Sequence, residues 1–119
     1  MIEIVVNKYD FKEDTISTVY FSFDGKYFPS KDWTDYDATI RVWSSILSEN
    51  GSSGSADFMD GPYHFSVERM SGEIYKFTFM IEYLSGLKKV DECLASRDEY
   101  KRIISDIKSF LDEVGTTSI

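Results

Sequence analysis

The sequence predicts an α+β fold, in which two amphipathic helices pack on a mainly antiparallel β-sheet of about five to six strands. Aromatic and branched side chains alternate over residues 73–84, as in a strand with one buried face. Apolar side chains recur every three or four positions over residues 33–47 and 100–114, as along the buried stripe of a helix. The length of 119 residues suits one domain, so we expect residues 1–119 to form it, with residues 116–119 frayed.

Strands are expected where branched and aromatic residues are dense and turn residues bound them. Asp24-Gly25 is a hairpin signal, and Pro29 ends the short strand that follows, because proline cannot donate to a ladder. Residues 50–55 contain only Asn, Gly and Ser and predict a flexible loop. Residues 85–95 fit either a strand or a short helix. The expected strands cover residues 2–6, 15–23, 26–28, 56–59, 63–70 and 73–84.

The first helix is expected to begin near residue 30 and to end near Glu49. Ser30 or Asp32 can serve as its N-cap, and Asp35 lies in its first turn, where the helix dipole favours negative charge. Spacings of three and four place its apolar residues on one face. That face consists of Trp33, Tyr36, Ile40, Trp43 and Leu47.

The second helix occupies the C-terminal part of the chain. Ser96 followed by Glu99 is a capping box, which predicts where the helix begins. Gly115 is expected to stop it, because glycine readily adopts the left-handed conformation that ends many helices. The residues that share its buried face are Tyr100, Ile103, Ile104, Ile107, Leu111 and Val114.

Acidic residues outnumber basic ones, above all in the first half of the chain. The formal net charge is −8, and residues 1–60 carry eleven Asp or Glu against five Lys or Arg. Such a protein is repelled by nucleic acid and by anionic membrane surfaces, so we expect neither as a partner. A basic protein is the natural partner. The alternative interpretation is that the acidity only keeps a small protein soluble.

Cysteine content and the start of the chain both indicate the cytoplasm. Cys93 is the single cysteine, which excludes an intramolecular disulfide and suits a reducing compartment. Met1 leads directly into Ile2–Val6, a stretch too short and too acidic for a signal peptide. We therefore expect a cytoplasmic protein.

Residue types that could support catalysis are sparse. His64 is the only histidine, and the nearby Asp60 could orient it as a general base. No nucleophile accompanies it in a recognisable motif, because Cys93 is distant in the sequence and no serine lies in a nucleophile elbow. We therefore expect no catalytic residue; an enzyme that uses His64 is the weaker alternative.

Metal and cofactor sites are not predicted. Asp32, Asp35 and Asp37 lack the central glycine and terminal glutamate of a calcium loop, and helix capping explains the first two. One cysteine and one histidine cannot make a structural zinc site. Gly51 and Gly54 are not followed by the Lys-Ser or Lys-Thr pair of a phosphate loop. We expect neither a metal nor a cofactor.

Carboxylates lie among large rings in two short stretches, residues 32–37 and 57–63. Such a surface can attract a basic protein through its carboxylates and anchor it through its rings. Trp33 and Trp43 belong to the apolar stripe and are assigned to the core. The predicted docking surface consists of Asp32, Asp35, Asp37, Asp57 and Asp60, with Tyr27 and Tyr63 as anchors.

Four motifs stand out between about residues 16 and 113. They are Phe-Asp-Gly-Lys-Tyr-Phe-Pro at residues 23–29, Trp33-Thr34-Asp35, the helix around Trp43, and Phe-Met-Asp-Gly-Pro-Tyr at residues 58–63. Together they resemble the small immunity proteins of bacterial polymorphic-toxin and contact-dependent growth inhibition systems. The motifs are structural: turn glycines, a proline before a helix, and core tryptophans.

The resemblance implies a non-enzymatic antidote in the cytosol. Such a protein binds one cognate toxin domain, often a nuclease, and blocks its active site or substrate surface. We therefore expect a monomer that binds a basic toxin domain one to one. The alternative is a small acidic chaperone of a secreted effector; such chaperones usually dimerise and expose apolar grooves.

Overall fold

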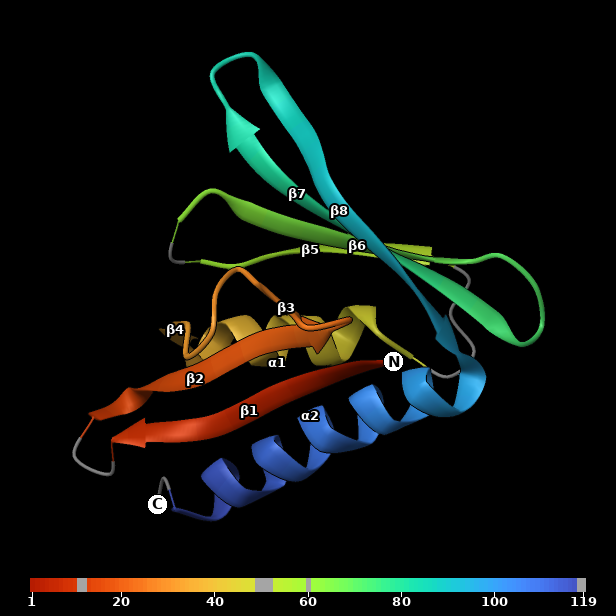
Figure 1. The fold of residues 1–119 in the computed structure, drawn as a ribbon. Coiled ribbons are helices and arrows are strands. Elements are labelled where there is room, and N and C mark those ends of the chain that lie inside the picture. The colour runs from red at the N-terminus through yellow and green to blue at the C-terminus, as the bar shows by residue number, and fades with distance from the viewer. Residues whose placement is uncertain (11–12, 49–52, 60, 118–119) are drawn as a thin grey trace.

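Two antiparallel sheets and two helices make up the protein in a computed structural model, which describes residues 1–10, 13–48, 53–59 and 61–117. The α+β fold class is confirmed. The described residues form eight strands in place of the expected five to six, because the strands divide between two four-stranded sheets (Figure 1).

The first sheet is built around its longest strand, β2. Strand β1 pairs with one edge of β2, while β3 and β4 pair one after the other with the opposite edge. Asp24 and Gly25 have positive φ angles of 50° and 76°, which confirms the predicted hairpin turn. Residues 29–33 leave the sheet between β3 and β4. The strands are β1 (Ile2–Asp10), β2 (Glu13–Phe23), β3 (Lys26–Phe28) and β4 (Thr34–Tyr36).

The first helix begins later than predicted. Helix α1 spans Asp37–Ile46, and residues 34–36 form β4, so neither Ser30 nor Asp32 is its N-cap and Asp35 is outside its first turn. The cause is pairing with the edge of β2, because the backbone of residues 33–36 forms hydrogen bonds with that strand. At the start of this segment the Val19 amide donates to the Trp33 carbonyl at 2.9 Å. Ile40, Trp43 and Leu47 are buried as predicted.

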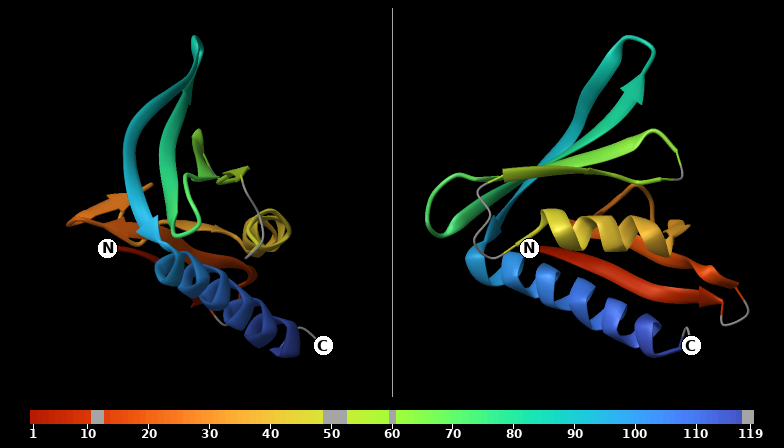
Figure 2. Two further views of the ribbon diagram at one scale, coloured as in Figure 1. Left: turned by 90° about the vertical axis from the view of Figure 1, so that its right-hand side faces the viewer. Right: turned by 180° about the vertical axis from the view of Figure 1, so that it is seen from behind.

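The second sheet is a meander in the order β5-β6-β7-β8. Residues 53–55 belong to β5, contrary to the predicted loop, whereas residues 50–52 lie outside the described residues. Residues 85–95 fall mostly in β8, which settles their structure as strand. The hairpin of β7 and β8 extends away from the body of the molecule (Figures 1 and 2). The strands are β5 (Ser53–Asp57), β6 (Tyr63–Arg69), β7 (Ile74–Tyr83) and β8 (Gly86–Ser96).

Helix α2 spans Arg97–Thr117 and begins with the predicted capping box. The Ser96 amide donates to the Glu99 carboxylate at 3.0 Å, and the Glu99 amide donates to the Ser96 hydroxyl at 3.1 Å. The second carboxylate oxygen of Glu99 accepts the Ile2 amide at 2.7 Å, which ties α2 to β1. Gly115 does not stop the helix. No helix in the described residues is long and apolar enough to cross a lipid bilayer.

Phe21 lies at the centre of the core, where the inner faces of the two sheets meet α1. Its ring centroid is 6.1 Å from that of Trp43 in α1. The corresponding distances to Phe65 and Phe79 in the second sheet are 4.9 and 5.5 Å. Helix α2 covers the same core. The ring of its Tyr100 stacks on the ring of Tyr75 in β7, with centroids 3.9 Å apart. The helices therefore share one core with both sheets.

Truncation of Phe21 tests this arrangement. We expect Phe21→Ala to lower the free energy of unfolding by about 3–5 kcal/mol, because a cavity would open where both sheets and α1 meet. Urea unfolding followed by circular dichroism measures the loss. Val42→Ala on the exposed face of α1 is the control and should change stability by less than about 0.5 kcal/mol. A loss below about 1 kcal/mol for Phe21→Ala would contradict the assigned core.

Stability should also depend on pH through Glu99. Burial acts to raise the pKa of Glu99, but hydrogen bonds from the Ser96 amide, the Ile2 amide and the Ser96 hydroxyl outweigh it, so the pKa is lowered. A lowered pKa in the folded state stabilises the protein above the unfolded pKa, and this contribution disappears as the pH falls through the folded pKa. We expect Glu99→Gln to cost about 1 kcal/mol at pH 7.

Denaturant titrations at a series of pH values test this. The difference between the natural protein and Glu99→Gln should shrink as the pH is lowered from 7 towards 3, while the exposed control Glu68→Gln should stay close to the natural protein throughout. A Glu99→Gln difference that is constant with pH would show that the carboxylate charge contributes nothing.

Candidate functional site

The carboxylates predicted to form one docking surface divide into buried and exposed groups. Asp35 is only 2% exposed, so its assignment to an accessible surface was wrong. One carboxylate oxygen accepts the Thr39 hydroxyl and the Tyr36 amide, both at 2.8 Å. The other accepts the Trp33 indole N–H at 3.3 Å. Asp35 therefore joins β4 to the first turn of α1.

Asp37 is also buried, with 8% of its surface exposed, which corrects the second of these assignments. Its carboxylate accepts the hydroxyl of fully buried Ser17 in β2. It also forms an ion pair with Lys8 of β1, with Nζ 3.4 Å from Oδ2. A buried carboxylate needs such partners because removal from water is costly. Asp37 thus connects α1 to two strands of the first sheet.

The remaining parts of the two predicted stretches meet at the surface. The rings of Trp33 and Tyr63 pack edge to face with centroids 5.0 Å apart. Gly61 fits against both rings: a Cβ there would lie 3.3 Å from Tyr63 and 3.4 Å from Trp33, and its φ of 109° favours glycine. Phe28 also packs against Tyr63, with ring centroids 5.6 Å apart. Segments distant in sequence are therefore held side by side.

We call this region the Trp33–Tyr63 surface and define it as residues 30–33, 57–59, 61–64 and Glu82. Asp32 and Asp57 are exposed, and Tyr63 is half-buried. Asp57 projects with His64 from the outer face of the second sheet, the face opposite that of Tyr63, so the surface wraps around the end of the sheet. Asp60 lies outside the described residues. Glu82 belongs here because its amide donates to the Pro62 carbonyl at 2.7 Å.

Tyr27, the other predicted anchor, lies apart from this surface. It is 44% exposed and packs against Tyr20 on the outer face of the first sheet, with ring centroids 5.8 Å apart. Lys31 connects the two regions, because its Nζ lies 5.9 Å from the Tyr27 ring centroid. Tyr27 therefore borders the surface without belonging to its aromatic contact.

Two further residues of the surface were not predicted from the sequence as binding residues. Met59 is exposed beside the Gly61 turn, and Glu82 lies at the end of β7. Glu82 could have been found by following the outward-facing positions of that strand, since alternate residues of a strand face the same side. Met59 is a single exposed apolar residue and gives no such signal.

His64 lies between two carboxylates of this surface. Its Nδ1 contacts Asp57, which is directly opposite it on β5, and its Nε2 is 3.5 Å from Glu82 Oε1. In the part of the chain that the structure describes, the carboxylates beside His64 are therefore Asp57 and Glu82; Asp60, which the sequence suggested, lies outside it. Cys93 lies on the inner face of the sheet, and burial above all raises the pKa of its thiol. The thiol cannot serve as a nucleophile beside His64, because the sheet separates them.

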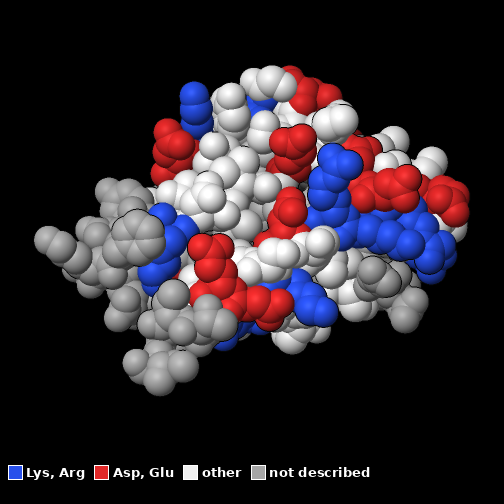
Figure 3. All heavy atoms as spheres, turned by 90° about the horizontal axis from the view of Figure 1, so that it is seen from below, with Lys and Arg blue, Asp and Glu red and all other residues white. Residues whose placement is uncertain are grey.

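Charge is mixed over at least one face of the molecule. On the face drawn in Figure 3, acidic and basic side chains lie beside each other around an uncharged area. The acidic excess is therefore not one continuous patch there. Among the described residues, no group of three or more His, Cys, Asp and Glu is placed to hold a metal ion.

A matched pair of substitutions tests the division between buried and exposed carboxylates. We expect Asp37→Asn to lower the free energy of unfolding by about 2 kcal/mol, because the ion pair that Asp37 forms with Lys8 inside the fold would be lost. Asp57→Asn removes the same charge at an exposed position and should cost less than about 1 kcal/mol. Equal losses in urea unfolding would refute the structural role given to Asp37.

Comparison with known protein families, characterised proteins and solved structures finds no match to this chain.

Proposed function

We propose that the protein is a non-enzymatic immunity protein that binds and neutralises a secreted bacterial toxin domain through the Trp33–Tyr63 surface. Binding is one to one, the toxin domain is basic, and a nuclease is the expected class. The observation that supports this most is the joining of two acidic and aromatic segments by the Trp33–Tyr63 contact, with Asp32 and Asp57 left exposed. The cytoplasm is the proposed location.

The chemistry of the surface suits a nuclease. A nuclease presents positive charge to its substrate, so exposed carboxylates can occupy the same surface and speed the encounter. Rings and apolar side chains supply most of the binding energy once water is excluded. Tyr63 is held in place by Trp33 and Phe28, so little side-chain freedom would be lost on binding.

A chaperone of a secreted effector is the second candidate. The hairpin of β7 and β8 favours it, because Tyr83, Leu84 and Leu87 are exposed near its tip. Exposed apolar residues of this kind can hold an unfolded client. Light scattering coupled to size exclusion separates the two functions: a dimer favours the chaperone, and a monomer favours the immunity protein.

Charge reversal tests the proposed surface. The binding partner to test is a candidate toxin domain; if the gene directly upstream encodes a large secreted protein, the C-terminal domain of that protein is the candidate. We expect the double variant Asp32→Lys and Asp57→Lys to slow association at least about tenfold at low salt, with a weaker salt dependence. Stopped-flow or biolayer interferometry at several salt concentrations measures the rate constant.

The control reverses the same amount of charge elsewhere. Glu73→Lys and Asp112→Lys lie outside the Trp33–Tyr63 surface, and both residues are exposed. This pair should alter association by no more than about threefold. Equal effects of the two double variants would show that the acids act only through the net charge of the protein. If Asp32→Lys with Asp57→Lys left toxin binding and protection of cells against the toxin unchanged, the proposed surface would be refuted.

A further inference from the structure

Among the described residues, no strand pairs with the outer edge of β1, and this edge borders a groove. The direction of its backbone groups follows from Ile2, whose amide points away from β2 to reach Glu99. Backbone groups alternate in direction along a strand, and the register from Ile2 to Lys8 has no irregularity. The N–H and C=O groups of Ile4 and Val6 therefore also point away from β2.

The opposite edge of β2 supports this assignment. Ile2 and Val6 face Phe23 and Val19 of β2. Phe23 closes the Asp24-Gly25 hairpin with Lys26, and the Val19 amide donates to Trp33, so both residues turn their backbone groups away from β1. The pairs that join β1 to β2 by hydrogen bonds are consequently the odd-numbered residues of β1.

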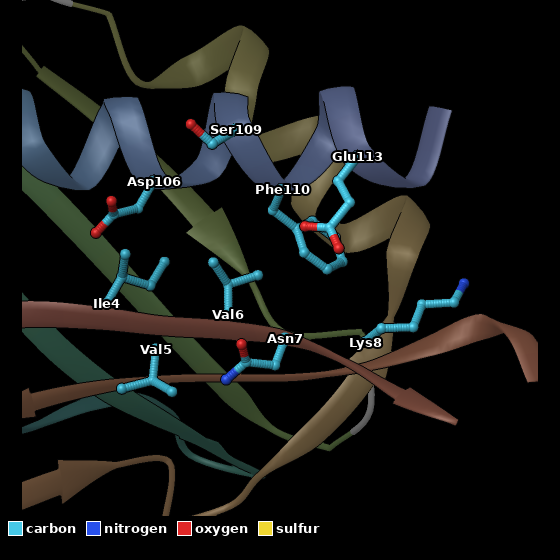
Figure 4. A pocket seen from close by; sticks show the side chains of 9 residues that line it. All are labelled: Ile4, Val5, Val6, Asn7, Lys8, Asp106, Ser109, Phe110 and Glu113. Atoms are coloured by element: carbon cyan, nitrogen blue, oxygen red, sulfur yellow. The ribbon is translucent and has the colours of Figure 1, made fainter. Parts of the chain in front are cut away.

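A groove lies along this edge, between β1 and α2. It encloses about 360 Å³. Figure 4 shows the side chains of Ile4 and Val6 directed towards α2, and Asp106 and Ser109 on the helix above them. The groove thus combines outward-facing backbone donors and acceptors of β1, an apolar wall, the two carboxylates Asp106 and Glu113, and one cation, Lys8, at the end where β1 leaves the helix.

The other long open edge, β8, carries features that discourage pairing. An irregularity in register leaves Val90 as an extra residue between Lys89 and Asp91, and Lys88 and Lys89 place charge on that edge. Lys26 also reaches across to Asp91 at 3.2 Å. Bulges and lysines are the usual means of blocking edge-to-edge association. The Ile4–Val6 segment of β1 has neither.

We propose that β1 is a strand-addition site, which binds an extended, basic segment of a partner protein in the groove beneath α2. Main-chain hydrogen bonds to Ile4 and Val6 would supply affinity, and a lysine or arginine facing Asp106 would supply selectivity. A second copy of this chain is disfavoured, because each copy carries a net charge of −8. The site lies at the edge of the sheet opposite β3 and β4, so the inference stands independently of the toxin proposal.

The test uses a short, end-blocked peptide of alternating lysine and valine. Titration into the isotopically labelled protein should shift the amide resonances of Ile4 and Val6 in NMR spectra. A peptide of the same sequence with N-methyl groups on alternate residues keeps the charge but cannot form the ladder, and should bind at least about tenfold more weakly. Equal binding of both peptides would reduce the interaction to electrostatics and overturn the proposal.

Two protein variants locate the site. Val6→Pro removes an outward-facing donor without touching the β1–β2 ladder and should weaken peptide binding at least about tenfold, while Val6→Thr keeps the amide and should bind normally. Asp106→Asn should weaken binding several-fold, whereas Asp112→Asn, which lies beside the groove between α1 and α2, should not. The proposed occupant would be contradicted if the peptide did not bind, or if its binding shifted resonances only in other strands. It would also be contradicted if the protein alone formed a dimer that Val6→Pro abolished, because β1 would then pair with a second copy of this chain.

Discussion

Packing around Phe21 is the interaction on which the rest of the structure depends. The two sheets share no strand among the described residues, so they are joined by side chains and by the connecting helices. Phe21 of the first sheet contacts both Phe65 and Phe79 of the second. Because this contact fixes the angle between the sheets, it also fixes the distance between residues 29–33, which connect β3 to β4, and residues 57–59 and 61–63, which lie at the end of β5 and the start of β6.

The acidic residues serve two different purposes once the fold is formed. Asp35 and Asp37 hold the junction of β4 and α1 against β1 and β2, and their hydrogen bonds explain why carboxylates can be buried there. Asp32 and Asp57 remain at the surface, where Asp57 contacts only His64 of the neighbouring strand among the contacts described above. The functional proposal therefore depends on fewer carboxylates than the sequence suggested, and these lie in the two segments that the Trp33–Tyr63 contact joins.

Local chemistry made much of the fold predictable. The Asp24-Gly25 turn and the Ser96–Glu99 capping box depend on neighbouring residues only, and both are confirmed. The start of the first helix was wrong because Trp33 and Tyr36 continue a helical period by coincidence, while the open edge of β2 takes up their backbone. Sequence periodicity cannot reveal a competing strand that lies far away in the chain.

The candidate site was predictable only in part, for a similar reason. Asp35 and Asp57 have the same side chain and similar aromatic neighbours in the sequence, yet one is buried and the other exposed. Their difference arises from pairing: Asp35 faces Ser17 across an inner ladder position, whereas Asp57 faces His64 on the outer side of the second sheet. The convergence of Trp33, Gly61 and Tyr63 is a tertiary property that no local pattern contains.

Hydrogen–deuterium exchange of the protein, free and bound to the proposed toxin domain, tests the central claim most directly. The claim is that residues 30–33, 57–59 and 61–64, brought together by the Trp33–Tyr63 contact, form the binding surface. Slower exchange in both segments on binding, with little change at the tip of the β7–β8 hairpin, is the predicted result. Protection confined to that tip, or absent from both segments, would contradict the account.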